Sequence, residues 1–105
     1  MIGIDILKVS RFRNSFSEKF RERVFSDREQ AYCEAKHNKI LHYAARFAAK
    51  EAVIKALGNS SLNLKKIEVL NRASGAPYIR LTGSKKRIRV SLSHENDFVV
   101  AVAVA

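Results

Sequence analysis

The chain has 105 residues, of which 47% are hydrophobic, so residues 1–105 suffice for one folded domain and are too apolar for a disordered tail. No run of about 20 apolar residues exists, which excludes a membrane-spanning helix, and the single cysteine, Cys33, excludes an internal disulfide. Twenty Lys and Arg against ten Asp and Glu give a net charge of +10, which predicts an anionic partner.

The first residues predict a strand and a cellular setting. Met1 to Leu7 is short, apolar and β-branched, as in a buried strand. No basic segment of a signal peptide precedes it, and with one cysteine we expect a reducing, cytoplasmic environment.

Three helices are predicted next. Ser10 is expected to cap the first, and Ser26 to Glu29 matches a capping box that starts the second, which runs to about Lys36. Asn38 is the expected N-cap of the longest helix, Lys39 to Leu57, and Gly58 follows its last residue. The first helix would carry four apolar residues on one face at i, i+4 spacing: Phe12, Phe16, Phe20 and Val24.

The second half of the chain predicts four strands separated by turns. Strand, helices and then four strands indicate an α+β fold with a largely antiparallel sheet. The last strand is apolar without alternation, so we expect it to be covered on both faces, by a helix on one side or by another subunit. The predicted strands are 67–70, 78–81, 88–92 and 98–104, with His94 to Asp97 as the last turn.

Asp5 is an acid inside an apolar strand. A buried carboxylate is costly unless it has a cation, a hydrogen-bond network or a proton. Two interpretations are therefore open, a salt bridge to one of the many basic residues and a metal or catalytic site.

Glu51 and Lys55 lie on the longest helix, in line with Phe47 at i, i+4 and i+8. The simplest interpretation is an exposed ion pair between the two charged residues. Ala48 and Ala52 flank the line, however, which indicates a face packed closely against another element. A carboxylate on that face could share a cation with Asp5.

The histidines and Cys33 do not form a zinc motif, because His37 and His42 have no ligand spacing that fits. Cys33 is best explained as a small buried residue. His94 follows Ser93 at the end of a predicted strand, where the hydroxyl and backbone N–H groups would make a polar cup for phosphate.

Three segments together resemble the holo-acyl-carrier-protein synthase family, the small 4′-phosphopantetheinyl transferases. The resemblance spans essentially the whole chain, and the Lys50-Glu51-Ala52 core is its most specific part. The matching segments are Ile2-Gly3-Ile4-Asp5-Ile6, the stretch from Arg46 to Gly58, and Gly75-Ala76-Pro77 with Val90-Ser91-Leu92-Ser93-His94-Glu95.

The resemblance implies a magnesium-dependent transfer of 4′-phosphopantetheine from coenzyme A to a serine of an acidic acyl carrier protein, a step that supports fatty acid biosynthesis. Adenosine 3′,5′-bisphosphate is released. Members of this small type form homotrimers with active sites between subunits. No membrane or nucleic acid would take part.

Individual residues match the family pattern. Asp5 and Glu51 match the magnesium ligands, and Lys55 matches the catalytic lysine near the coenzyme A phosphates. Glu51 is the preferred group for removing the serine proton. The implied coenzyme A contacts are Arg46, Lys55, Gly75, Pro77, Ser93 and His94, of which Arg46 and His94 would come from the neighbouring subunit. The implied carrier-protein contacts are Arg11, Arg13 and Arg21.

Two other classes remain open. A nucleic-acid-binding domain would explain the charge, with Lys85 to Arg89 contacting phosphates, although such a run is more often a solvated edge. A scaffold that binds acidic carrier proteins without chemistry is the third possibility. Neither class gives Asp5 a role.

Overall fold

Strands and helices follow one another in the predicted order in the computed structural model, which describes residues 1–105 and confirms the α+β class. No helix combines the length and the apolar character needed to cross a membrane. The elements are β1 (Ile2–Lys8), α1 (Val9–Ser15), α2 (Glu18–Val24), α3 (Asp27–Glu34), α4 (Lys39–Leu57), the 3-10 turn η1 (Leu64–Lys66), β2 (Ile67–Asn71), β3 (Pro77–Leu81), β4 (Arg89–Glu95) and β5 (Phe98–Val104).

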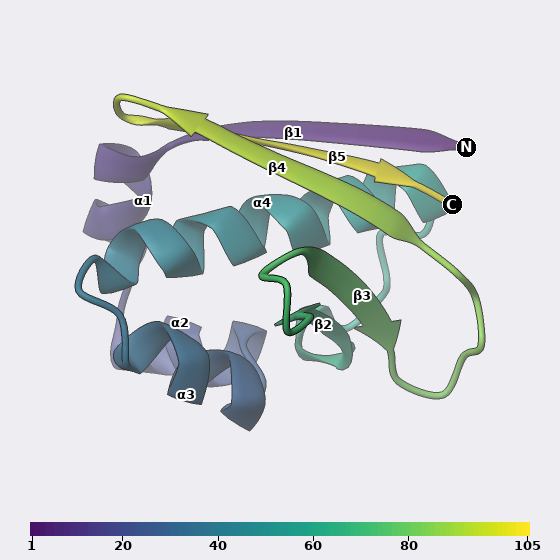
Figure 1. Ribbon diagram of the computed structural model, residues 1–105, viewed down its shortest axis with the longest axis horizontal. Helices are drawn as coiled ribbons and strands as arrows, with labels where there is room; N and C mark the ends of the chain where they lie inside the picture. The colour runs from purple at the N-terminus through teal and green to yellow at the C-terminus, as the bar shows by residue number, and fades with distance from the viewer.

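The strands form two antiparallel sheets rather than one. The larger has the order β1-β5-β4, and the smaller is the β2–β3 hairpin. Helix α4 runs beneath the three-stranded sheet, and the hairpin and α3 lie on the other side of the helix (Figure 1). The chain ends of β1 and β5 lie together, because these strands pair along their whole length.

Contact between β1 and α4 is close because Gly3 has no side chain. A Cβ atom at Gly3 would lie 2.0 Å from the carbonyl oxygen of Ala52 and 2.6 Å from the backbone nitrogen of Ala56. Ala52 is fully buried, as the sequence predicts for its face of the helix, and Ala56 is fully buried as well. The backbones of β1 and α4 therefore meet directly, which brings Asp5 next to the helix.

The helix caps predicted from the sequence are confirmed. The Ser26 hydroxyl and the Glu29 carboxylate form the capping box of α3, which ends at Glu34, earlier than predicted. Asn38 accepts a hydrogen bond from the backbone of Leu41 at the start of α4, and Gly58 ends it with a left-handed φ of 67°.

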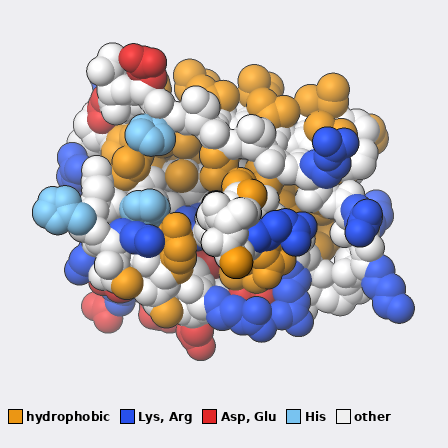
Figure 2. Space-filling model, viewed as in Figure 1, with side chains coloured by type: hydrophobic (Ala, Val, Ile, Leu, Met, Phe, Trp, Pro, Cys, Tyr) orange, Lys and Arg blue, Asp and Glu red, His pale blue; other side chains and the backbone are white.

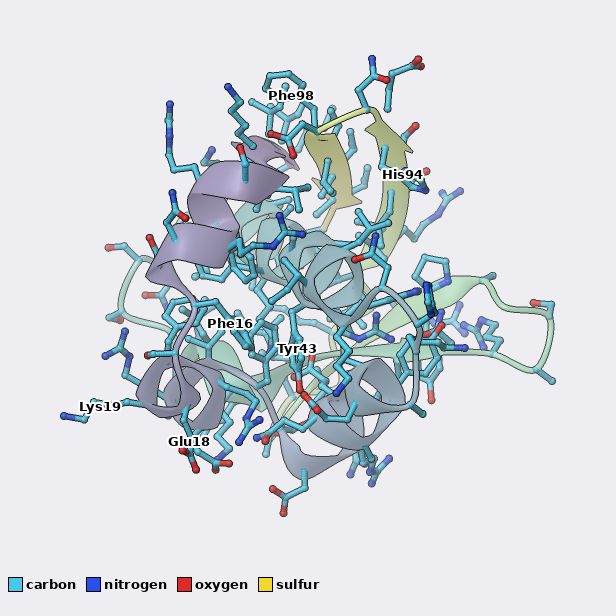
Figure 3. The ribbon with its side chains drawn as sticks, turned by 90° about the vertical axis from the view of Figure 1, so that its left-hand side faces the viewer. Phe16, Glu18, Lys19, Tyr43, His94 and Phe98 are labelled. Carbon is cyan, nitrogen blue, oxygen red and sulfur yellow. The ribbon has the colours of Figure 1, made fainter.

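The prediction of one helix from Ser10 to Val24 is wrong, because the chain bends between α1 and α2. Phe16 has an extended backbone, and the Ser17 hydroxyl accepts a hydrogen bond from Phe20 N and so starts a new helix. Ser10 does not cap α1, since its hydroxyl and N–H both donate to Asp97. The bend turns Phe16 onto Tyr43 of α4, with ring centroids 4.8 Å apart (Figure 3).

The outer face of the three-stranded sheet is apolar and open. Ile2, Ile4 and Ile6 are 72%, 58% and 64% exposed, so β1 is buried on its inner face only, unlike the prediction. The outer side chains of β5 begin with Phe98, which is 45% exposed, while its inner side chains are buried. Hydrophobic side chains accordingly gather along the upper edge of the molecule (Figure 2).

Candidate active site

Asp5, Glu51 and Lys55 come together between β1 and α4. The Lys55 ammonium donates to Asp5 Oδ1 at 3.1 Å and to the carbonyl oxygen of Ile4 at 2.9 Å. The helix spacing alone would suggest an ion pair between Glu51 and Lys55. In the structure, Lys55 pairs with Asp5 instead. The Asp5 side chain is only 17% exposed, whereas that of Lys55 is 54% exposed. The site is thus open to solvent on the lysine side.

Glu51 has an altered acidity. Burial raises the pKa of the Glu51 carboxyl, the negative charge of Asp5 raises it further, and Lys55 partly opposes the shift. Two carboxylates held near each other, of which only Asp5 is paired with a lysine, carry an excess of negative charge. Such a site favours a second cation.

The shifted acidity of Glu51 predicts a pH-dependent stability of the ligand-free protein. A carboxyl whose pKa is raised on folding binds more protons in the folded state. The free energy of unfolding therefore falls as the pH rises from the carboxyl's ordinary pKa through its raised pKa. Glu51→Gln should therefore raise the melting temperature at neutral pH and leave it nearly unchanged in acid. Melting curves against pH measure this, with exposed Glu22→Gln as the control. Equal effects of Glu51→Gln at both pH values would contradict it.

Arg46 lies on a different face of α4, against α3 and the β2–β3 hairpin. It is 4% exposed, its guanidinium donates to the Asn71 side chain, and it stacks over the Tyr32 ring at 4.0 Å. Arg46 Nε is buried and has no partner. The Asn71 amide in turn donates to the carbonyl oxygen of Gly75 at 2.9 Å. Arg46, Gly75 and the start of β3 at Pro77 are thus connected, whereas Asp5 and Glu51 are elsewhere.

Ser93 and His94 do not form the predicted cup. The strand β4 continues to Glu95, so both residues have extended backbone and their side chains point to opposite faces of the sheet. His94 pairs in register with buried Val99, which places it on the α4 side. Its side chain is exposed at the same end of the molecule as Phe98 (Figure 3).

A groove of about 660 Å³ opens beside the predicted carrier-protein contacts, between β1, α1 and α4. Its walls are mostly aromatic and aliphatic, with two cations at the rim. Arg13 is exposed on α1 but does not line the groove. The lining residues are Ile6, Leu7, Lys8, Arg11, Phe12, Ser15, Phe20, Phe47 and Phe98.

Arg21 is less available than the sequence predicts. Its guanidinium lies 3.7 Å from Glu34 of α3 and 3.9 Å from Glu18, and its side chain is only 26% exposed. Glu18 itself points into solvent together with Lys19 (Figure 3). Arg21 thus serves chiefly to hold α2 on α3.

Several residues at these surfaces were not identified from the sequence. Phe47 lines the groove, Tyr32 supports Arg46, and Asn71 links Arg46 to the hairpin. Lys50 is fully buried although it stands in a charged motif. Its spacing of four residues from Arg46 was the available signal, since both then lie on one helical face.

Known proteins match this chain over nearly its whole length. A model of the 4′-phosphopantetheinyl transferase superfamily matches residues 1–103. The holo-[acyl-carrier-protein] synthase of Thermodesulfovibrio yellowstonii is 43% identical over 107 residues, which cover 98% of this chain and 95% of the relative.

Solved structures agree with the sequence comparison. The Helicobacter pylori holo-[acyl-carrier-protein] synthase in complex with coenzyme A has a TM-score of 0.85 and 34% identity, covering 99% of this chain and 98% of its own. The Bacillus anthracis synthase, in complex with CoA (3′,5′-ADP), has a TM-score of 0.86 and 33% identity, covering 97% and 91%. The chain therefore belongs to the 4′-phosphopantetheinyl transferase superfamily and, within it, to the holo-[acyl-carrier-protein] synthases.

Proposed function

We propose that the protein transfers 4′-phosphopantetheine from coenzyme A to a serine of an apo acyl carrier protein, as a step that serves fatty acid biosynthesis. The observation that carries the proposal is the cluster of Asp5, Glu51 and Lys55 at the contact of β1 with α4. Phosphoryl transfer depends on positioning and charge neutralisation more than on covalent chemistry, and this cluster supplies groups for both.

The reaction assigns a role to each group. The serine oxygen attacks the phosphorus that carries the pantetheine, and the bond from that phosphorus to the bridging oxygen breaks, so that adenosine 3′,5′-bisphosphate leaves. Glu51 takes the serine proton, because it is the carboxylate of the cluster that is not already paired with Lys55. Lys55 has three donors and uses two on Asp5 and Ile4, which leaves one for a phosphate oxygen.

Asp5 and Glu51 fit a magnesium ion. No third His, Cys, Asp or Glu side chain completes a metal-binding group with them. Magnesium matches this donor set, since it commonly takes one or two carboxylates together with substrate phosphates and water. When bound, the ion would supply positive charge to the diphosphate oxygens.

The nucleotide end of coenzyme A is assigned to residues that lie away from the carboxylates within one chain. Arg46 and the hairpin residues Gly75 and Pro77 form one group, and His94 with Ser93 lies on the other side of α4. A homotrimer resolves this separation, because residues of one subunit then complete the site of the next. The open apolar face of β1 and β5 is the kind of surface that a second subunit covers.

The carrier protein is assigned to the aromatic groove and the cations beside it. An acidic helical partner would place an apolar side chain among Phe12, Phe20 and Phe47 and its carboxylates against Arg11 and Arg13. Arg21 contributes less, because Glu34 already pairs with it.

The direct test incubates the purified protein with coenzyme A, magnesium and an apo carrier protein and measures the intact mass of the carrier. We expect the mass of the carrier to increase by one phosphopantetheine group, and we expect no increase when the modified serine is replaced by Ala. A carrier that stays unmodified at any enzyme concentration would reject the proposal.

Thermal melting separates the enzyme from a nucleic-acid-binding protein. The basic run Lys85 to Arg87 lies in the exposed segment between β3 and β4, where Lys and Arg side chains gather at the right of the molecule (Figure 2). We expect adenosine 3′,5′-bisphosphate with magnesium to raise the melting temperature more than either alone, and duplex DNA to have no effect. Protection by DNA alone would favour the binding protein.

Charge reversal on α1 tests the docking assignment. Arg11→Glu with Arg13→Glu should raise the KM for carrier protein about tenfold, because each exposed pair contributes modestly and reversal adds repulsion. The KM for coenzyme A should stay unchanged, and salt should bring the wild type towards the variant. Arg80→Glu with Lys85→Glu, on the β3 side, is the matched control. If the α1 variant instead raised the KM for coenzyme A and left the KM for carrier protein unchanged, the basic helix would face the nucleotide.

A further inference from the structure

Lys50 and Glu29 form an ion pair that is 0% exposed on both sides, between α4 and α3. Lys50 Nζ donates to Glu29 Oε1 at 2.7 Å and to the carbonyl oxygens of Leu64 at 2.7 Å and Ile67 at 2.6 Å. All three ammonium donors are therefore used. Burial lowers the pKa of Lys50, and the Glu29 carboxylate opposes that shift. The pair takes no part in the site around Asp5.

The pair supplies hydrogen-bond partners to the free edge of β2. Backbone bonds to β3 are made by alternate residues, beginning at Lys66 with Thr82 and ending at Arg72 with Ala76. Ile67 and Val69 consequently turn their backbone groups away from β3. The Ile67 carbonyl oxygen accepts from Lys50, and Val69 N donates to Glu29 Oε2 at 3.0 Å.

These two bonds are the ones that a single residue of a parallel neighbouring strand would make, with a donor to one carbonyl and an acceptor for the N–H two residues later. Lys50 and Glu29 thus replace a missing strand. Glu29 is also fixed by Ser26 N at 3.0 Å, so the capping box of α3 is joined to the same edge. The Ser26 hydroxyl donates to Glu68 Oε2 at 2.7 Å, which adds a second contact between the start of α3 and β2.

Arg46 holds the opposite end of the same strand. It precedes Lys50 by four residues on α4 and donates to the side chain of Asn71, the last residue of β2. Asn71 then bonds to Gly75 at the tip of the hairpin. One face of α4 is therefore hydrogen-bonded to both ends of β2, through Lys50 to Ile67 and through Arg46 to Asn71.

We propose that the Lys50–Glu29 pair is a positioning device that fixes the β2–β3 hairpin for the nucleotide of coenzyme A. This inference rests on the proposed function, which assigns Gly75 and Pro77 of the hairpin to that substrate. A two-stranded hairpin is not stable by itself, and it needs another element to define its place. Neither Lys50 nor Glu29 touches the substrate in this arrangement.

The experiment uses Lys50→Met with Glu29→Gln, a double variant that leaves no unpaired buried charge. Gln at position 29 keeps a capping box, since Glu and Gln both serve at that position. The bond to the Ile67 carbonyl oxygen is lost. Tyr43→Phe is the matched control, because it removes a partly buried hydrogen bond from α4 to α3, which the hydroxyl of Tyr43 donates to Glu34, without touching β2.

Hydrogen exchange and kinetics are measured together. In the ligand-free double variant, amide exchange in residues 67–81 should be at least about tenfold faster than in the wild type, as expected of a locally loosened unit. Exchange in β1 and β5 should stay close to the wild-type rate. The KM for coenzyme A should rise about tenfold, while kcat and the KM for carrier protein stay within about twofold. Tyr43→Phe should change none of these. Lys50→Gln with Glu29→Gln, which also leaves no unpaired buried charge and keeps a neutral hydrogen-bond donor at position 50, should show a smaller change in the same direction and serves if the Met variant does not fold.

Other outcomes reject the inference. Unchanged exchange of the hairpin would show that the pair does not hold it, and a uniform rise in every element would show a role in global stability only. A fall in kcat at constant KM for coenzyme A would show that Lys50 acts through its neighbour Glu51. A wild type that takes up no coenzyme A would instead reject the proposed function, whereas equal binding by wild type and double variant would reject the positioning role alone.

Discussion

Replacing Asp5 by Asn or Glu51 by Gln should each reduce phosphopantetheine transfer by about 100-fold or more, because charge stabilisation in a transition state is commonly worth that much per group. Each carboxylate is one of only two that the chain offers to a cation at this place. Asp5 also holds Lys55, so Asp5→Asn frees the lysine as well. Single-turnover rates at saturating magnesium, coenzyme A and carrier protein measure the effect.

The fold should survive both substitutions, since Asn and Gln keep the shape of the native side chains. Glu34→Gln is a suitable control, because Glu34 is an exposed acid at the end of α3 that pairs with Lys39 and Arg21 and not with Asp5, Glu51 or Lys55. It should transfer at the wild-type rate. Turnover close to wild type in either Asp5→Asn or Glu51→Gln would remove the carboxylate site from the mechanism.

Mixing two inactive variants should restore activity if subunits share their sites. With Glu51→Gln and His94→Ala subunits in equal amounts, about one quarter of the sites in a random cyclic trimer would combine an intact Glu51 with an intact His94 from the next subunit. Activity near a quarter of wild type is therefore expected. The expectation depends on the open face of β1 and β5, where Ile4 is 58% exposed, being covered by other copies.

Three controls make the mixing experiment decisive. Each variant alone should be nearly inactive, subunit exchange should be demonstrated with labelled chains, and light scattering should give three times the chain mass. Ile4→Lys should lower both the mass and the activity, because it places a charge in the centre of the apolar face. A fully active monomer would reject the shared site.

Local elements of this protein were predictable where one residue type determines the outcome. Asn38 and Gly58 delimit α4 as predicted, because an N-cap side chain and a left-handed glycine act within a few residues of the chain. The capping box at Ser26 was predictable for the same reason. The period of the phenylalanines, in contrast, predicted one helix where Ser17 starts a second. Apolar spacing alone does not distinguish a continuous helix from two helices that share a core.

The α+β class and the ends of α4 could be predicted from the residues alone, and the resemblance of their motifs predicted that an acid of the first strand acts together with an acid of the long helix. Which charged groups pair with one another depends on the packing of distant elements. Lys55 turns to Asp5 instead of Glu51 because Gly3 lets β1 lie directly on α4. Lys50, its neighbour in the motif but on another face of the helix, is buried against Glu29 and the edge of β2. Local pattern places a side chain on a face, but only the packing of distant elements determines what that face meets.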